Sequence, residues 1–163
     1  MLLFRSGNEK KEYKMAFSDD NGGFAFLCED AKFSVCASTW NTRLSQLGKI
    51  HGSLYIMTHH LPNPDYIAKI ISKRPHNIFI IANIDARENA QLIKSKFPLV
   101  RIALHPNINA KVVLVAPETV WVASSDFGET KMLESAIGLH SVAVHNRAVE
   151  SFFNTEWAKS IEL

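Results

Sequence analysis

Four of the polar side chains within residues 111–134 have types and spacing that could do ionic or hydrogen-bonding chemistry together. They are Lys111, Ser124, Asp126 and Glu134. A lysine ammonium is a compact charge that either holds a phosphate oxygen or pairs with a carboxylate. We expect Lys111 and Asp126 to lie on adjacent strands of a hairpin, close enough to form a buried or half-buried ion pair. The sequence leaves both roles of Lys111 open, phosphate binding and pairing with Asp126.

The order and spacing of these residues follow a known pattern. Residues 108–127 read INAKVVLVAPETVWVASSDF. This segment resembles the active-site segment of the phospholipase D superfamily, whose motif is H-x-K-x4-D-x6-G-S-x-N with a glutamate further on. Lys111, Ser124 and Glu134 keep the residue types of that motif, and Phe127 matches an aromatic residue that often follows it. The resemblance implies the α/β fold of this superfamily, and a single motif in a short chain resembles its nuclease branch, whose members pair as homodimers.

Four positions of the motif have changed type. Asn109 stands in the place of the histidine, Ala116 of the aspartate, Ala123 of the glycine and Asp126 of the asparagine. The resemblance implies a metal-independent double displacement, in which one imidazole attacks phosphorus and a paired histidine acts as general acid and then base. The amide nitrogen of Asn109 has no available lone pair and does not titrate near neutral pH. The carboxylate of Asp126 would also repel a phosphate.

These changes favour a binding function over catalysis. In a homodimer both subunits would carry Asn109, so nucleophile and acid–base group would be lost together. The favoured interpretation is a degenerate phospholipase D-like protein, not an enzyme, that binds a nucleic acid or a protein partner as a homodimer. One alternative is a metal-independent phosphodiesterase or nuclease with a rebuilt site. Another is a subunit that an intact partner chain completes. We expect no cofactor.

Two adjacent histidines are the candidates for a rebuilt site. His59 and His60 follow the apolar run 53–57, a predicted strand, at the end where α/β sheets usually place their sites. Either imidazole could project into the cleft and replace the missing histidine, although two histidines in a loop are more often solvated. The remaining histidines have no spacing typical of a metal site, so we expect no bound metal.

Charge is unevenly distributed along the chain. Residues 60–111 carry eight Lys and Arg against three Asp and Glu, whereas residues 112–163 carry three against seven. A basic segment of this kind is able to contact a nucleic-acid backbone. The candidate contacts are Lys69, Lys73, Arg74, Lys94 and Lys96. The alternative is that these residues only form solvated helix faces.

Apolar runs alternate with helical patterns after residue 40, which predicts an α/β domain with a mixed sheet and helices on both faces. We expect one domain over 1–163, with residues 1–32 as an extension of β-hairpins. Strands are predicted at 12–17, 24–28, 33–37, 53–57, 78–82, 100–104, 109–115, 119–123 and 135–144. Helices are predicted at 41–47, 63–74, 85–97 and 146–161, with Asn63, Asp85 and Asn146 as caps.

Composition is that of an ordinary globular domain. The chain has 163 residues, 47% of them apolar, and a formal net charge of +2. No apolar run approaches the roughly 18 residues that a membrane span needs, and the first residues are too short for a secretory signal. Cys28 and Cys36 are spaced like neither a zinc clamp nor a redox pair, so we expect reduced thiols and a cytoplasmic protein.

Overall fold

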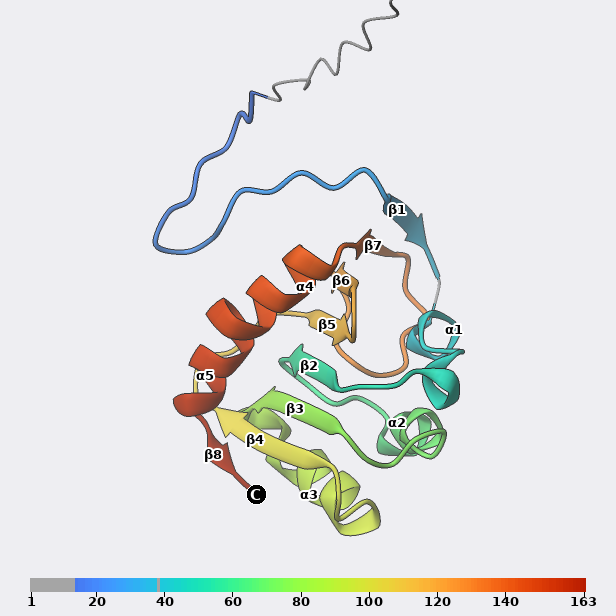
Figure 1. Cartoon of the computed structure of the whole chain (residues 1–163). Coiled ribbons are helices and arrows are strands. Elements are labelled where there is room, and N and C mark those ends of the chain that lie inside the picture. The colour runs from blue at the N-terminus through green and yellow to red at the C-terminus, as the bar shows by residue number, and fades with distance from the viewer. Residues whose placement is uncertain (1–13, 38) are drawn as a thin grey trace, which may run out of the picture.

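A mixed sheet forms the centre of the computed structural model, which describes residues 14–37 and 39–163 (Figure 1). Its strands are β1 (Ala31–Cys36), β2 (Leu54–Thr58), β3 (Ile78–Asn83), β4 (Arg101–His105), β5 (Val112–Val115), β6 (Thr119–Ala123), β7 (Glu134–His140) and β8 (Ile161–Glu162). The eight strands follow the order β1-β7-β6-β5-β2-β3-β4-β8. Strands β2, β3 and β4 are parallel, and the neighbouring pairs on either side are antiparallel.

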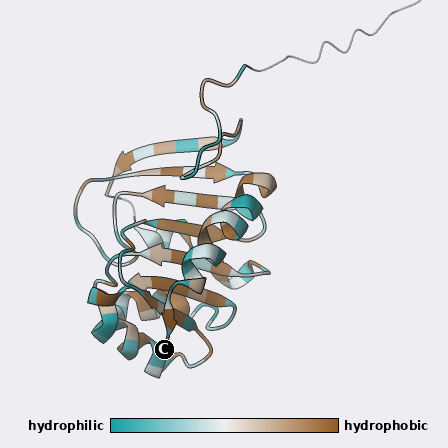
Figure 2. Cartoon of the chain, turned by 90° about the vertical axis from the view of Figure 1, so that its left-hand side faces the viewer, coloured by the Kyte–Doolittle hydropathy of each residue, from teal (hydrophilic) through white to brown (hydrophobic). Residues whose placement is uncertain are grey.

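Helices cover both faces of this sheet. One face carries α1 (Trp40–Arg43), α2 (Pro64–Ile71) and α3 (Arg87–Lys96), together with the 3-10 turns η1 (Leu47–Lys49) and η2 (Ile84–Ala86). The other carries α4 (Val142–Ala148) and α5 (Asn154–Ala158), joined without a break by the π-helical turn η3 (Val149–Phe153). The sheet separates two apolar cores, and its strands are mostly apolar along their length (Figure 2). The predicted mixed sheet flanked by helices is confirmed.

The central strands form where apolar residues face both cores. Ile80 and Ile81 of β3 point to opposite faces and both are fully buried, as expected for a parallel strand covered on both sides. Helix α2 begins as predicted, because the Asn63 side chain accepts a hydrogen bond from the Tyr66 N–H at 3.2 Å and Pro64 occupies the first turn. The connection from β3 to α3 is capped differently. The side chain of Asn83, not that of Asp85, accepts from the N–H two residues later, at 3.0 Å.

The chain differs from the prediction at both ends. Before residue 31, the described residues have only an isolated bridge between Asp20 and Gly23, so the strand predicted at 24–28 is wrong. This segment finds no sheet edge to pair with, because β1 already occupies the edge beside β7. Part of the strand predicted at 12–17 lies outside the described residues.

At the other end, β7 stops at His140 and a helix starts at once. The Ser141 side chain accepts from the Val144 N–H at 3.3 Å, so Ser141 is the cap that was predicted at Asn146. The short apolar run 142–144 fits either a strand or a helix, and a capping hydroxyl decides between them. Ile161, expected on the last helix, lies in β8 beside β4.

No helix in residues 14–37 and 39–163 has both the length and the apolar character to cross a bilayer.

Close packing between β6 and β7 gives a test of the fold. Trp121 lies over Gly138, and a Cβ added there would come within 2.7 Å of the indole. We expect Gly138→Ala to lower the free energy of unfolding by about 1–3 kcal/mol through overpacking. Gly22→Ala is the matched control, because a Cβ at that turn meets its nearest atom only at 3.7 Å. Urea unfolding of both variants checks this, and equal stabilities would contradict the packing described.

Candidate functional site

Three chain segments meet at the ends of two central strands, where β2 ends and β5 begins. Met57 pairs with Val112 in an antiparallel ladder, so residues that follow β2 lie beside residues that precede β5. His59 and His60 come from the first of these segments, and Asn109 and Lys111 come from the second. Asp126, from the loop after β6, is the third component. This convergence brings together five of the residues singled out in the sequence.

Asp126 anchors the loop to the end of β2. Its Oδ1 atom accepts hydrogen bonds from the Thr58 hydroxyl at 3.0 Å, the His59 N–H at 2.9 Å and the His60 N–H at 3.1 Å. Its backbone oxygen accepts from the Trp40 indole at 3.0 Å. A carboxylate with three donors on one oxygen is held by charge-assisted hydrogen bonds. Asp126 therefore has a structural role that does not depend on a ligand.

Lys111 is surrounded by acceptors from its own chain. Its Nζ atom donates to Asn109 Oδ1 at 2.8 Å and lies 3.9 Å from Asp126 Oδ1. Both side chains of the ion pair are only 19% exposed. The ammonium is thus within pairing distance of the carboxylate, which is the arrangement expected if Lys111 pairs with Asp126.

His59 lies beside the residue that replaces the motif histidine. Its Nδ1 atom is 3.1 Å from Asn109 Oδ1, and its Nε2 atom is 3.2 Å from Asp85 Oδ2. The ring of His60 stacks on it with centroids 4.1 Å apart. A neutral imidazole has one N–H and faces two acceptors here, so it donates to one of them at a time. Asn109 Oδ1 is therefore shared between the imidazole and the ammonium of Lys111.

Asp85 belongs to this site, although the sequence pattern predicts it only as a helix cap. A signal for it was present, because Asp85 follows β3 as His59 follows β2. Parallel neighbouring strands end at the same edge of a sheet, which places the residues after them near each other.

Ser124 and Glu134 form a separate pair next to this group. The Ser124 hydroxyl is hydrogen-bonded to Glu134 Oε2, and Ser124 Oγ also accepts from the Ser135 N–H at 3.0 Å. The pair stays near Lys111 because the neighbouring Ala123 N–H donates to the Lys111 carbonyl at 3.0 Å. These contacts join β6 to β7.

Ala116 does not belong to the pocket predicted from the motif. It follows β5 at the opposite end from Lys111, and its N–H donates to the Ser53 carbonyl at 3.1 Å, just before β2. A strand of this length carries the two ends too far apart for a shared pocket. Ala116 and Asn109 therefore share the motif in the sequence but do not lie together in the structure.

Two of the predicted nucleic-acid contacts are engaged inside the chain. Arg74 is 6% exposed and donates to the carbonyls of Ile50 at 2.9 Å and Gly52 at 2.5 Å. Burial lowers the pKa of its guanidinium. Arg74 therefore fastens the turn before β2 and is not a surface contact. Lys94 donates to two carbonyls after its own helix, those of Pro98 at 3.1 Å and Val100 at 2.9 Å.

The other three lysines remain on the surface. Lys69, Lys73 and Lys96 are exposed on or directly after α2 and α3. Lys73 donates to the Asn41 side chain at 2.6 Å, and Lys96 lies 4.0 Å from Asp65. Exposed pairs of this kind are weak and leave the ammonium accessible.

Within the described ranges, no three His, Cys, Asp or Glu side chains cluster in a way that could hold a metal ion. The arrangement at the end of β2 instead provides one ammonium, one amide, two stacked imidazoles and two carboxylates.

No family model matches this sequence, and no curated protein matches it. Solved structures do resemble it. Nuc from Salmonella typhimurium, a phospholipase D family member, gives a TM-score of 0.66 at 17% identity, over 82% of this chain and 99% of that one. NucT from Helicobacter pylori gives 0.62 at 15% identity, over 82% and 100%. TrmBL2, an archaeal chromatin protein with a novel mode of DNA binding, gives 0.59 at 13% identity, over 83% of this chain and 55% of that one.

These similarities define the class of fold. The chain has the phospholipase D fold, and it matches Nuc and NucT over almost their whole length. The fold predicted from the motif resemblance is confirmed.

The role of Asp126 can be tested by its removal. Asp126→Ala leaves the backbone N–H groups of His59 and His60 without their acceptor, so we expect a loss of about 2–3 kcal/mol in unfolding free energy. Asp126→Asn is the matched control, since it keeps an acceptor oxygen and should lose about 1 kcal/mol. Urea unfolding at neutral pH measures both. An alanine variant as stable as the wild type would show that this carboxylate does not hold the loop.

Proposed function

We propose that this chain is a phospholipase D-like protein that acts by binding and not by phosphodiester turnover. The observation that carries the proposal is the shared oxygen of Asn109, which bonds Lys111 at 2.8 Å and faces His59 at 3.1 Å. An amide in this position holds its neighbours but cannot attack phosphorus or transfer a proton. The polar groups of this site are already paired with one another within the chain.

The charges around Lys111 also disfavour the binding of a phosphodiester at this site. Lys111 is the only lysine or arginine in the group, and Asp126 lies 3.9 Å from it. Asp85 adds a second carboxylate beside His59. A phosphate would bring further negative charge to a site that is already neutral or negative. A polyanion is therefore expected to bind elsewhere on the molecule.

The surface of α2 and α3 is our candidate for a nucleic-acid contact. It presents the exposed Lys69, Lys73 and Lys96 and lies within the segment 60–111, whose net charge is +5. A neighbour of the same fold, TrmBL2, is a chromatin protein that binds DNA. Backbone contacts from lysines need no base readout. We propose a nucleic acid as the partner, and a protein partner is the alternative that remains if nucleic acid does not bind.

Binding to duplex DNA should depend on salt and on these lysines. We expect fluorescence anisotropy to show affinity that falls between about 50 and about 200 mM salt. Lys69→Glu with Lys73→Glu should weaken binding and reduce the slope of log affinity against log salt by about 2. Lys32→Glu, an exposed lysine on β1, is the matched control and should bind as the wild type does. Salt-independent or absent binding would contradict the nucleic-acid proposal.

A second candidate function is a phosphodiesterase that uses a displaced histidine. The contacts of His59 with Asp85 and Asn109 favour it, because a carboxylate on one ring nitrogen is the arrangement that orients a catalytic imidazole. In this alternative His59 attacks or protonates the substrate, Asp85 orients the ring, and Lys111 holds a phosphate oxygen. Asn109 must then release the second ring nitrogen.

An assay with bis-p-nitrophenyl phosphate in the presence of EDTA separates the two candidates. We expect no turnover above buffer for the wild type, because the nucleophile position is an amide. Turnover that His59→Ala and Lys111→Ala abolish, and that His140→Ala leaves intact, would support the second candidate instead. His140 is a suitable control because it also lies between two carboxylates, Asp30 and Glu118.

The repair variant Asn109→His with Asp126→Asn completes this assay, and Ala116 is left unchanged because it lies at the far end of β5. It should gain activity if the rest of the site is intact and the chain forms the homodimer that the motif resemblance implies. Light scattering of the same sample gives the number of chains. If the variant is a monomer and gains activity only when a chain with an intact motif is added, the heteromeric alternative is favoured.

A further inference from the structure

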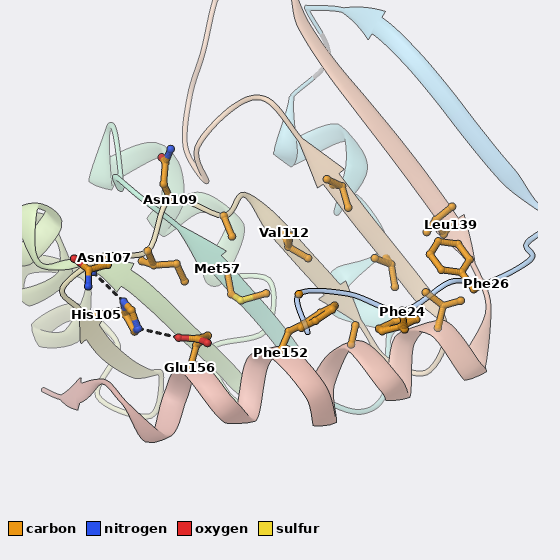
Figure 3. A pocket seen from close by; sticks show the side chains of 17 residues that line it. Phe24, Phe26, Met57, His105, Asn107, Asn109, Val112, Leu139, Phe152 and Glu156 are labelled. Atoms are coloured by element: carbon orange, nitrogen blue, oxygen red, sulfur yellow. Dashed lines mark hydrogen bonds and ion pairs between the residues drawn. The ribbon is translucent and has the colours of Figure 1, made fainter. Parts of the chain in front are cut away.

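A large apolar pocket lies on the face of the sheet that carries α4, and it meets the polar site around Lys111 at Asn109. Its volume is about 580 Å³, within the usual range for small-molecule sites. The floor is formed by side chains of β2, β5, β6 and β7, and one wall by α4 and the helical turns that follow it (Figure 3). Its lining includes Phe24, Phe26, Val122, Ala148, Phe152 and Glu156.

The N-terminal arm, residues 14–30, closes the remaining side. Phe24 stacks on Phe152 with ring centroids 5.4 Å apart, and the Arg147 guanidinium lies 4.5 Å from the Phe24 centroid. Arg147 also pairs with Asp19 at 2.6 Å. These contacts explain why the arm stays against α4 without forming a strand. They also hold the arm in place as one wall of the pocket, and the space between the arm and the sheet is not filled by side chains.

Charged groups in the pocket wall are already paired. Glu156 Oε2 lies 2.9 Å from His105 Nε2, and Oε1 accepts from Lys159 at 2.9 Å. The hydrogen bond from Lys159 holds the pKa of the Glu156 carboxyl below its ordinary value. His105 Nδ1 accepts from the Asn107 N–H at 3.0 Å, so the proton of a neutral ring is on the nitrogen that faces Glu156. No unpaired charge is available for an ionic head group in the described part of this wall.

Near His105 and Glu156, the pocket wall contains a neutral amide that is able to bind a polar head group. The Asn107 side chain is exposed at the mouth, and within residues 14–37 and 39–163 no hydrogen bond occupies its amide. An apolar pocket of this size leaves its lining side chains without dispersion contacts, which an apolar chain would supply. We propose that the pocket binds an uncharged amphiphile, with an alkyl chain between α4 and the sheet and a hydroxyl or amide head at Asn107.

Displacement of the neutral fluorophore N-phenyl-1-naphthylamine from the full chain tests this. We expect 1-decanol to displace the probe. Decanoate and decylammonium should do so about tenfold less well or worse, because each would place an unpaired charge in an apolar site. No displacement by 1-decanol, or equal displacement by all three compounds, would overturn the proposal.

Two neighbouring positions give a matched pair of variants. Val122 and Ile137 pair across β6 and β7 on the same face and are 45% and 40% exposed, but only Val122 lines the pocket. Val122→Trp should reduce the affinity for 1-decanol about tenfold by filling the pocket, and Ile137→Trp should leave it unchanged. The smaller Val122→Phe is used if the first variant fails to fold. A folded Val122 variant with full affinity would show that the ligand lies elsewhere.

Discussion

The carboxylate of Asp126 is the contact on which the arrangement of the candidate site depends. Its Oδ1 atom accepts from the backbone N–H groups of His59 and His60, and the Phe127 N–H donates to the Thr58 hydroxyl at 2.9 Å. Together these bonds hold the loop after β6 against the end of β2. The same Oδ1 atom of Asp126 lies 3.9 Å from Lys111, so the group that anchors the loop also reduces the positive charge of the site. One side chain thus determines both the geometry and the electrostatics of this edge of the sheet.

The remaining contacts follow from this anchor. Because His59 is fixed through its own backbone N–H, its ring is presented to Asn109 on one side and to Asp85 on the other. The amide of Asn109 then satisfies the ammonium of Lys111. A network in which each polar group has a partner is stable as it stands, and a ligand would have to break those contacts before making new ones. This is the physical basis for proposing that a nucleic acid binds outside this polar site.

The two faces of the sheet serve different chemistry. Alternate residues of β5 and β6 point to opposite sides, so Trp121 packs with the core of α1 to α3 while Val120 and Val122 line the pocket below α4. The polar site and the apolar pocket meet only at Asn109, which takes part in both. A ligand in the pocket and a polyanion on α2 and α3 would therefore occupy separate surfaces of one domain.

The sequence by itself determined the class of fold, the parallel strand β3 and the start of α2 at Asn63. Each depends on local patterning, such as an apolar run or a capping side chain followed by proline. It also singled out Lys111 and Asp126. Only the tertiary structure decided that Asp85 joins His59, that Arg74 is buried and that Ala116 lies at the far end of β5. These outcomes depend on which strand ends meet and which carbonyls lie within reach, and residues distant in sequence fix both when the sheet assembles.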